Sequence, residues 1–208
     1  MGNRAAAGRV YRGGQHFADL SSTRIVGSAF EVWPPISEDL EQALDIDPRH
    51  DRLVRGFGPK ALTRLRAAKI GVAGSGGGGS HVLQQLAYLG VATLVPADGD
   101  RVELTNLNRL IGSAPQRKRR NFVDRLLRRG RGDVGRAKVA VMEELVHAIN
   151  ENAVVDAHFE HFPSAETVQD FKECDLIVAC VDRLQVRDTR NSLCNRYLIP
   201  RISVGLRN

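Results

Sequence analysis

From residue 69 onward, short apolar runs alternate with longer amphipathic segments. Residues 70–73 form an uncharged apolar run, which predicts a strand buried on both faces. The following segment, 81–89, carries apolar residues at helical spacing and predicts a helix that packs on a sheet. A second strand is predicted at 94–95, and this strand–helix–strand order is typical of an α/β nucleotide-binding unit.

The rest of the chain continues the alternation of helices and strands. Further helices are predicted at 60–68, 135–150, 164–171 and 187–197, and further strands at 154–159, 175–182 and 199–204. Ser164 is the expected N-cap of the third of these helices. Because the chain stops just after the last predicted strand, we expect a domain that lacks its C-terminal part.

The first 47 residues follow no clear period. Pro34 and Pro35 interrupt any regular element, and a short capped helix is expected to begin after Ser37. We therefore expect residues 1–47 to form a helical or irregular extension of unknown role. Residues 48–208 are expected to form the α/β domain.

A glycine-rich loop, 74–79, joins the first predicted strand to its helix. Its spacing satisfies G-x-G-x-x-G, in which the first glycine permits a tight turn, the second lets the backbone approach a phosphate and the third lets the helix pack on the strand. The helix would direct its N-terminal amides at any anion above the loop. We expect four glycines to line a nucleotide site: Gly74, Gly76, Gly77 and Gly79.

Acidic and polar residues follow the second predicted strand. Asp98 stands about 20 residues beyond the glycines, the usual distance for an acid that binds a ribose hydroxyl. The loop 105–109 then carries two amides and an arginine where α/β folds place ligand contacts. Arg109 can hold a phosphate through two hydrogen bonds, and Asn106 can bond phosphate or ribose. Taken alone, this loop fits an ordinary capped turn equally well.

Composition excludes several classes of protein. No apolar run approaches the roughly 20 residues of a membrane span, so we expect no membrane association. The N-terminus has no apolar signal segment, which predicts a cytoplasmic protein. The three cysteines, Cys174, Cys180 and Cys194, show no C-x-x-C spacing, which argues against a zinc site or a disulfide framework within this chain.

The formal net charge of +6 comes largely from one basic block at 117–131. Its basic residues are Arg117, Lys118, Arg119, Arg120, Arg125, Arg128, Arg129 and Arg131. We expect a solvated loop, while docking of an acidic partner and screening of nucleotide phosphates stay open as alternatives. Aromatic residues suited to base stacking are nearly absent from the block, so nucleic-acid binding is not expected.

Seven motifs, taken together and in order, resemble the ThiF/MoeB/HesA family of ubiquitin-activating-enzyme-like adenylyltransferases. They are Arg49-x-x-Arg52, the glycine loop 74–79, Asp98-Gly-Asp100, Thr105-Asn-Leu-Asn-Arg109, Asp133-Val-Gly-Arg-Ala-Lys138, Cys180-Val-Asp182 and Ile199-Pro-Arg-Ile-Ser-Val204. The resemblance runs from about Arg49 to Gly205. It implies a Rossmann-like, doubly wound, mainly parallel α/β sheet in residues 48–208.

The resemblance also implies a reaction. In this family the C-terminal carboxylate of a ubiquitin-like or sulfur-carrier protein attacks the α-phosphate of Mg·ATP, which yields an acyl-adenylate and pyrophosphate. Arg109 and Lys138 resemble the phosphate-binding residues, and Asp182 resembles the carboxylate that binds Mg²⁺. The implied nucleotide contacts are Asp98 at the ribose, with Asp100 and Asn106 beside it.

Arg52 is similar to an arginine that the family inserts into the neighbouring subunit's site, which implies a homodimer or a heterodimer. An always-charged, fork-shaped side chain suits that task. The chain departs from the family pattern at Arg183, which puts a positive charge beside Asp182 where the family has asparagine. The family's later zinc-binding cysteine pairs and acceptor cysteine have no counterpart in this sequence, so no cysteine is assigned to thioester formation.

Two other functions are open on this evidence. A NAD(P)-dependent oxidoreductase accounts for the glycines and Asp98, but it leaves Arg109 and Lys138 unexplained. A non-catalytic subunit of a heterodimeric activating enzyme would account for Arg183 and for the abrupt end of the domain.

Overall fold

The chain consists of two compact units, Met1–Asp45 and Ile46–Asn208. The computed structural model describes the following residues: 9–12, 15–19, 23–25, 31–33, 47–115, 132–181 and 193–204. The second unit holds the sheet, the glycine loop and every described residue that the sequence pointed to as part of a site.

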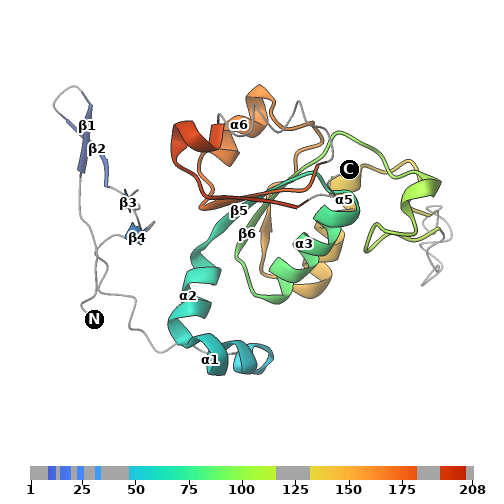
Figure 1. Cartoon of the computed structure of the whole chain (residues 1–208), viewed down its shortest axis with the longest axis horizontal. Helices are drawn as coiled ribbons and strands as arrows, with labels where there is room; N and C mark the ends of the chain where they lie inside the picture. The colour runs from blue at the N-terminus through green and yellow to red at the C-terminus, as the bar shows by residue number, and fades with distance from the viewer. Residues whose placement is uncertain are drawn as a thin grey trace. The chain divides into compact units, whose positions relative to one another are not determined.

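The described part of the first unit consists of short strands (Figure 1). β1 (Arg9–Arg12) pairs with β2 (Gln15–Asp19), and β3 (Thr23–Ile25) pairs with β4 (Glu31–Trp33), both antiparallel. We expected a helical or irregular extension, and the described residues are strands instead, because β-branched and aromatic residues recur in short runs that favour extended backbone. The helix expected after Ser37 lies outside the described residues.

Five parallel strands form the sheet of the second unit, in the order β7-β6-β5-β8-β9 (Figure 1). They are β5 (Lys69–Ala73), β6 (Thr93–Ala97), β7 (Val154–Val155), β8 (Leu176–Ala179) and β9 (Arg201–Ser203). The chain begins in the middle, moves outward through β6 and β7, and returns to the other side of β5 for β8 and β9. This reversal is the doubly wound topology that the resemblance implied, and it puts the switch point between β5 and β8.

Most predicted elements appear where the pattern placed them, with shorter strands at the edges of the sheet. β7 has two residues, whereas we predicted a strand over 154–159. Beyond Val155 the chain still follows the end of β6: the amides of Asp156 and His158 donate to Leu94 and Pro96, and the Asp98 amide donates to the His158 carbonyl oxygen. Pro96 has no N–H to offer on that side, so the ladder between the two strands is incomplete.

The strands place apolar side chains on both faces of the sheet, and helices cover each face. Ile70 and Val72 pack in one cluster with α3 (Gly77–Tyr88) and α5 (Lys138–Ile149). Residues on the opposite face pack against α6 (Ala165–Phe171), whose N-terminus is capped by the Ser164 hydroxyl as predicted. Gly71 faces α6 and leaves room for Phe171, since a Cβ at Gly71 would lie 2.9 Å from that ring.

The segment before the sheet forms η2 (Pro48–His50), α1 (Asp51–Phe57) and α2 (Pro59–Ala67). The His50 ring packs against Gly90, and the Arg49 guanidinium donates to the Ile149 carbonyl oxygen over 3.4 Å. Both partners stand just before strands begin, so η2 and α1 lie at the amino-terminal edge of the sheet. None of the described helices has the length and apolar character needed to cross a membrane.

Candidate functional site

The carboxyl ends of β5, β6 and β8 meet at one edge of the sheet, which we call the rim: Gly74–Gly79, Asp98–Arg109, Lys138 and Cys180–Val181. Gly74 turns there with a φ of +92°, a conformation that favours glycine. A Cβ at Gly74 would lie 2.7 Å from both the Cys180 carbonyl oxygen and the Val181 side chain. The loops after β5 and β8 therefore touch at the switch point, where open α/β sheets bind ligands.

Helix α3 begins inside the glycine run, four residues before the predicted start at 81. A Cβ at Gly79 would lie 1.9 Å from the Gly74 carbonyl oxygen, so only glycine allows the helix to pack this closely on the loop. Gly76 caps the helix, and a Cβ there would meet no atom within 4 Å. The space over this helix N-terminus is open to an anion that the amides can bind.

Asp98 fixes the glycine loop to the end of β6. Its side chain is buried, with 7% of the residue exposed. One carboxylate oxygen accepts the Ser75 amide over 2.7 Å, and the other accepts the Asp100 amide over 2.8 Å. Each carboxylate oxygen can accept a second hydrogen bond, so the geometry leaves capacity for a ribose hydroxyl.

Lys138 reaches the rim from the first turn of α5. Only 9% of the residue is exposed. Its ammonium lies 2.7 Å from an Asp100 carboxylate oxygen and 3.9 Å from Asp98. The ammonium therefore lies close to the carboxylate of Asp98, which also holds the glycine loop.

Arg109 lies across the glycine loop. It follows η3 (Leu104–Asn106), and its side-chain stem packs on Gly77, where a Cβ would lie 3.2 Å from the arginine Cδ. Its guanidinium is exposed and donates to the Thr105 carbonyl oxygen over 2.6 Å. The Asn106 side-chain oxygen accepts the Glu103 amide, so this amide also holds the turn in shape.

The structure thus brings together the four glycines and most of the other predicted residues: Asp98, Asp100, Asn106, Arg109 and Lys138. Arg52 is not among them, because α1 lies at the opposite edge of the sheet. Asp182 and Arg183 lie outside the described residues, as does the basic block at 117–131. Asp182 directly follows Val181, which touches the glycine loop.

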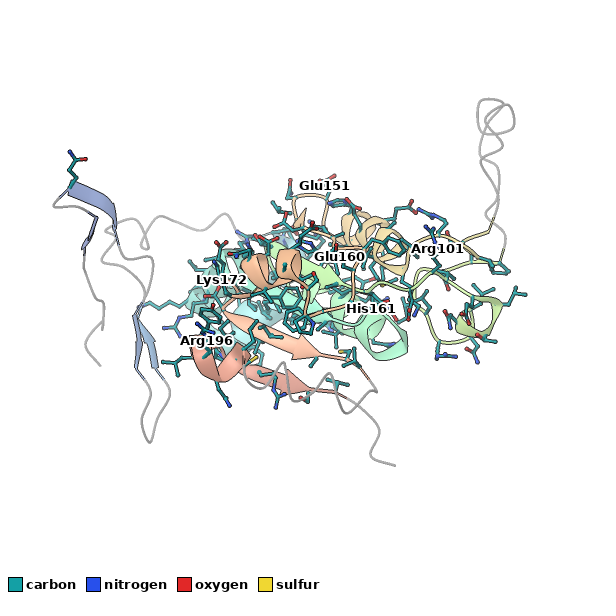
Figure 2. All side chains as sticks on the ribbon, turned by 90° about the horizontal axis from the view of Figure 1, so that it is seen from above. Arg101, Glu151, Glu160, His161, Lys172 and Arg196 are labelled. Carbon is teal, nitrogen blue, oxygen red and sulfur yellow. The ribbon has the colours of Figure 1, made fainter. Side chains whose placement is uncertain are left out.

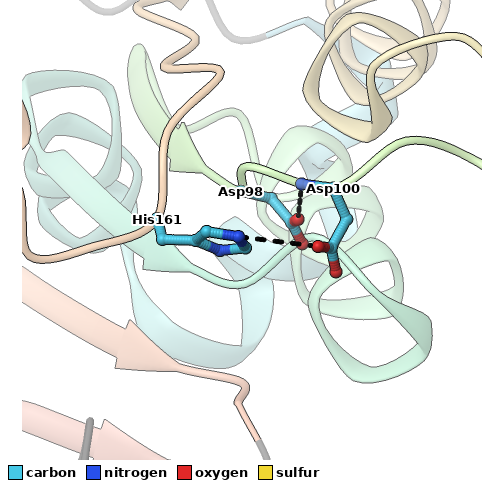
Figure 3. A group of neighbouring side chains, drawn as sticks. All are labelled: Asp98, Asp100 and His161. Carbon is cyan, nitrogen blue, oxygen red and sulfur yellow. Dashed lines mark hydrogen bonds and ion pairs between the residues drawn. The ribbon is translucent and has the colours of Figure 1, made fainter.

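His161 is a rim residue that the sequence did not point to (Figures 2 and 3). It lies between β7 and α6, 73% of its side chain is exposed, and its Nε2 is 3.6 Å from an Asp100 carboxylate oxygen. Its ring lies against Gly99, where a Cβ would come within 2.8 Å. The glycine between Asp98 and Asp100 was the one available signal that another group packs there.

Donor atoms of Asp98, Asp100 and His161 lie within 4.8 Å of one another, a spacing that can hold a metal ion. The surroundings do not fit one. The Lys138 ammonium already lies beside Asp100, and both oxygens of Asp98 accept backbone amides. A divalent cation would be repelled by that ammonium at close range. The Lys138 ammonium already supplies the positive charge that these carboxylates need.

Cys174 does not add a nucleophile to the site. Burial raises the pKa of the Cys174 thiol to about 12, and the thiolate is the reactive form. Cys180 packs beneath the glycine loop, close to where a Cβ of Gly79 would lie.

Comparison with known proteins gives a family match over most of the chain. A model described as the ThiF family matches residues 50–207. The chain is 29% identical over 161 residues to the tRNA threonylcarbamoyladenosine dehydratase of Haemophilus influenzae, which covers 76% of this chain and 55% of that protein. It is 33% identical over 135 residues to the adenylyltransferase and sulfurtransferase uba4 of Emericella nidulans, which covers 65% of this chain and 25% of that protein.

A solved structure has the same fold. The E. coli tRNA N6-threonylcarbamoyladenosine dehydratase, TcdA, in complex with ATP superposes with a TM-score of 0.62 and 27% sequence identity, over 76% of this chain and 59% of that one. The chain spans little more than half the length of either dehydratase.

Adjacent glycines of α3 give a matched test of the loop geometry. Gly79→Ala is expected to lower the free energy of unfolding by about 2 kcal/mol or more, because its Cβ would overlap a backbone oxygen. Gly78→Ala is expected to be neutral or stabilising by up to about 1 kcal/mol, because its Cβ would make ordinary contacts at 3.9 Å and alanine favours a helix. Urea unfolding measures both, and equal effects would contradict the packing described.

Proposed function

The chain belongs to the ThiF family, and on this premise we propose that it activates a substrate carboxylate by adenylylation with ATP. One observation carries the proposal. Arg109 packs on the glycine loop at the N-terminus of α3, and Lys138 lies beside the buried acid Asp98, which holds that loop. A dinucleotide-dependent oxidoreductase needs the loop and the acid, but it gives the two cations no task.

The nucleotide would lie along the rim. Its phosphates would face Gly76, Gly77 and the amides at the start of α3, and its ribose would face Asp98. Arg109 now donates to the Thr105 carbonyl, and a phosphate would offer it a charged acceptor in place of that neutral one.

The reaction makes one bond and breaks one. A carboxylate oxygen of the substrate attacks the α-phosphorus, and the bond from this phosphorus to the bridging oxygen of the β-phosphate breaks. Pyrophosphate leaves, and the product is an acyl-adenylate. Negative charge builds on the phosphate oxygens during the step, so fixed cations at Arg109 and Lys138 would lower its barrier.

We propose that Asp182 holds Mg²⁺ at this site. Support comes from its place in the chain, directly after Val181, whose side chain touches the glycine loop. The ion would neutralise phosphate charge. Arg183 beside it would weaken metal binding through like-charge repulsion.

We propose that the substrate is the C-terminal carboxylate of a ubiquitin-like or sulfur-carrier protein. The relative uba4 is described as an adenylyltransferase and sulfurtransferase, which supports a carrier. The dehydratase relatives are described as acting on a modified tRNA, so a carboxylate on tRNA is the second candidate. We further propose a cytoplasmic location, where ATP and such carriers are available.

We also propose a dimer in which Arg52 serves the partner's site. Arg52 is exposed on α1, and the contacts of His50 and Arg49 hold this segment at the edge opposite the rim. The arginine therefore has no short path to the glycine loop of its own chain. Binding in a neighbouring copy gives its charge a role.

Pyrophosphate exchange tests the reaction. Incorporation of labelled pyrophosphate into ATP is expected when a carrier protein is supplied, and Arg109→Ala is expected to reduce the rate at least about 100-fold. Arg196→Ala, which removes another exposed arginine, is the matched control and should leave the rate unchanged.

Full exchange in Arg109→Ala would contradict the proposal. Exchange with tRNA bearing N6-threonylcarbamoyladenosine but with no carrier would instead identify the tRNA as the substrate. ATP binding without exchange on either substrate would identify a non-catalytic subunit.

Mixing two inactive variants tests the role of Arg52. A dimer of one Arg52→Ala chain and one Arg109→Ala chain holds one intact site if Arg52 acts on the partner. Random pairing is then expected to restore about a quarter of the wild-type exchange rate. No recovery after mixing and re-equilibration, with dimers confirmed by light scattering, would contradict the proposed arrangement.

A further inference from the structure

Lys138 is bonded at both ends to a single residue, Asp100. Its backbone amide donates to the Asp100 carbonyl oxygen over 3.1 Å. Its side-chain ammonium donates to an Asp100 carboxylate oxygen over 2.7 Å. Asp100 therefore holds both the backbone of Lys138, at the start of α5, and the ammonium at the end of its side chain.

Asp100 is itself held by Asp98. The Asp100 amide donates to one oxygen of the Asp98 carboxylate (Figure 3). The Ser75 amide donates to the other oxygen. The path of hydrogen bonds thus runs from the glycine loop through Asp98 and Asp100 to the Lys138 ammonium.

The physical need for such a partner is clear from the lysine side chain. A lysine has a flexible four-carbon stem that loses rotamer entropy when it is fixed, and a buried ammonium is unfavourable unless it is paired. The stem of Lys138 is almost fully buried, so the ammonium has few alternative places. Asp100 is half exposed and supplies the charged acceptor at the end of the buried lysine stem.

We propose that Asp100 is a positioning residue that fixes the Lys138 ammonium for phosphate binding, and that it does not itself contact the nucleotide. The inference rests on the proposed function, and it replaces the direct nucleotide contact that the resemblance implied for Asp100. It also gives the acidic cluster on the rim a task, since its carboxylates orient a lysine.

The alternative is a direct contact between Asp100 and the nucleotide, and a double-mutant cycle separates the two. Asp100→Asn removes the charge while nearly keeping the shape, and Lys138→Met keeps the buried stem without the ammonium. If Asp100 acts through the lysine, its replacement matters only while Lys138 is present. If Asp100 touches the nucleotide, its replacement costs affinity in both backgrounds.

The experiment is titration of the four proteins with ATP by calorimetry. Asp100→Asn is expected to weaken ATP binding about tenfold when Lys138 is present, and less than about twofold in the Lys138→Met background. Asp100→Glu should restore part of the affinity, because it keeps the charge. Glu173→Gln, which breaks a surface ion pair with Lys69, is the matched control and should bind ATP as the wild type does.

An equal loss of affinity in both backgrounds would overturn the inference, and so would an unchanged affinity in Asp100→Asn. Urea unfolding of each variant shows whether the protein is folded when ATP is added. Failure of the wild type to bind ATP is a separate result, which would contradict the proposed function itself.

Discussion

The buried carboxylate of Asp98 is the contact on which the rim depends. It binds the glycine loop through the Ser75 amide and the following turn through the Asp100 amide. The same turn holds the Lys138 ammonium. A single side chain thus holds the ends of β5 and β6 and the start of α5 in fixed positions relative to one another. A site assembled from separate loops requires this. Because Asp98 is almost fully enclosed, these bonds are little screened by water.

The glycines set the other constraint, which is distance. Gly74 and Gly79 bring a strand, a helix and the loop after β8 into direct contact, where any side chain would overlap a backbone atom. This packing leaves the N-terminus of α3 facing open space. The fold therefore offers a helix N-terminus, two cations and an acid within one edge of the sheet. Arg52 is at the opposite edge, so the role that we propose for it requires a second chain.

The sequence predicted the central part of this fold well, because its signals are local. The apolar run at 70–73, the spacing of the glycines and the acid at Asp98 are visible without any distant contact. The start of α3 was placed late, since glycines read as a loop until their packing on β5 is known. The strands near the N-terminus were missed, because short runs without clear alternation do not distinguish a strand from irregular chain. His161 and the Asp100–Lys138 pair could not be predicted, since they depend on how the loop after β7 and the start of α5 approach the end of β6.

The most direct test of the central claim, a rim built for ATP, is the thermal unfolding midpoint with Mg·ATP and, separately, with NADH. A ligand that binds only the folded state raises this midpoint by mass action. The account predicts a rise with Mg·ATP that grows with concentration, and no rise with NADH. A rise with NADH alone would contradict it, because the glycine loop and Asp98 would then serve a dinucleotide, and Arg109 and Lys138 would have no phosphate-transfer role.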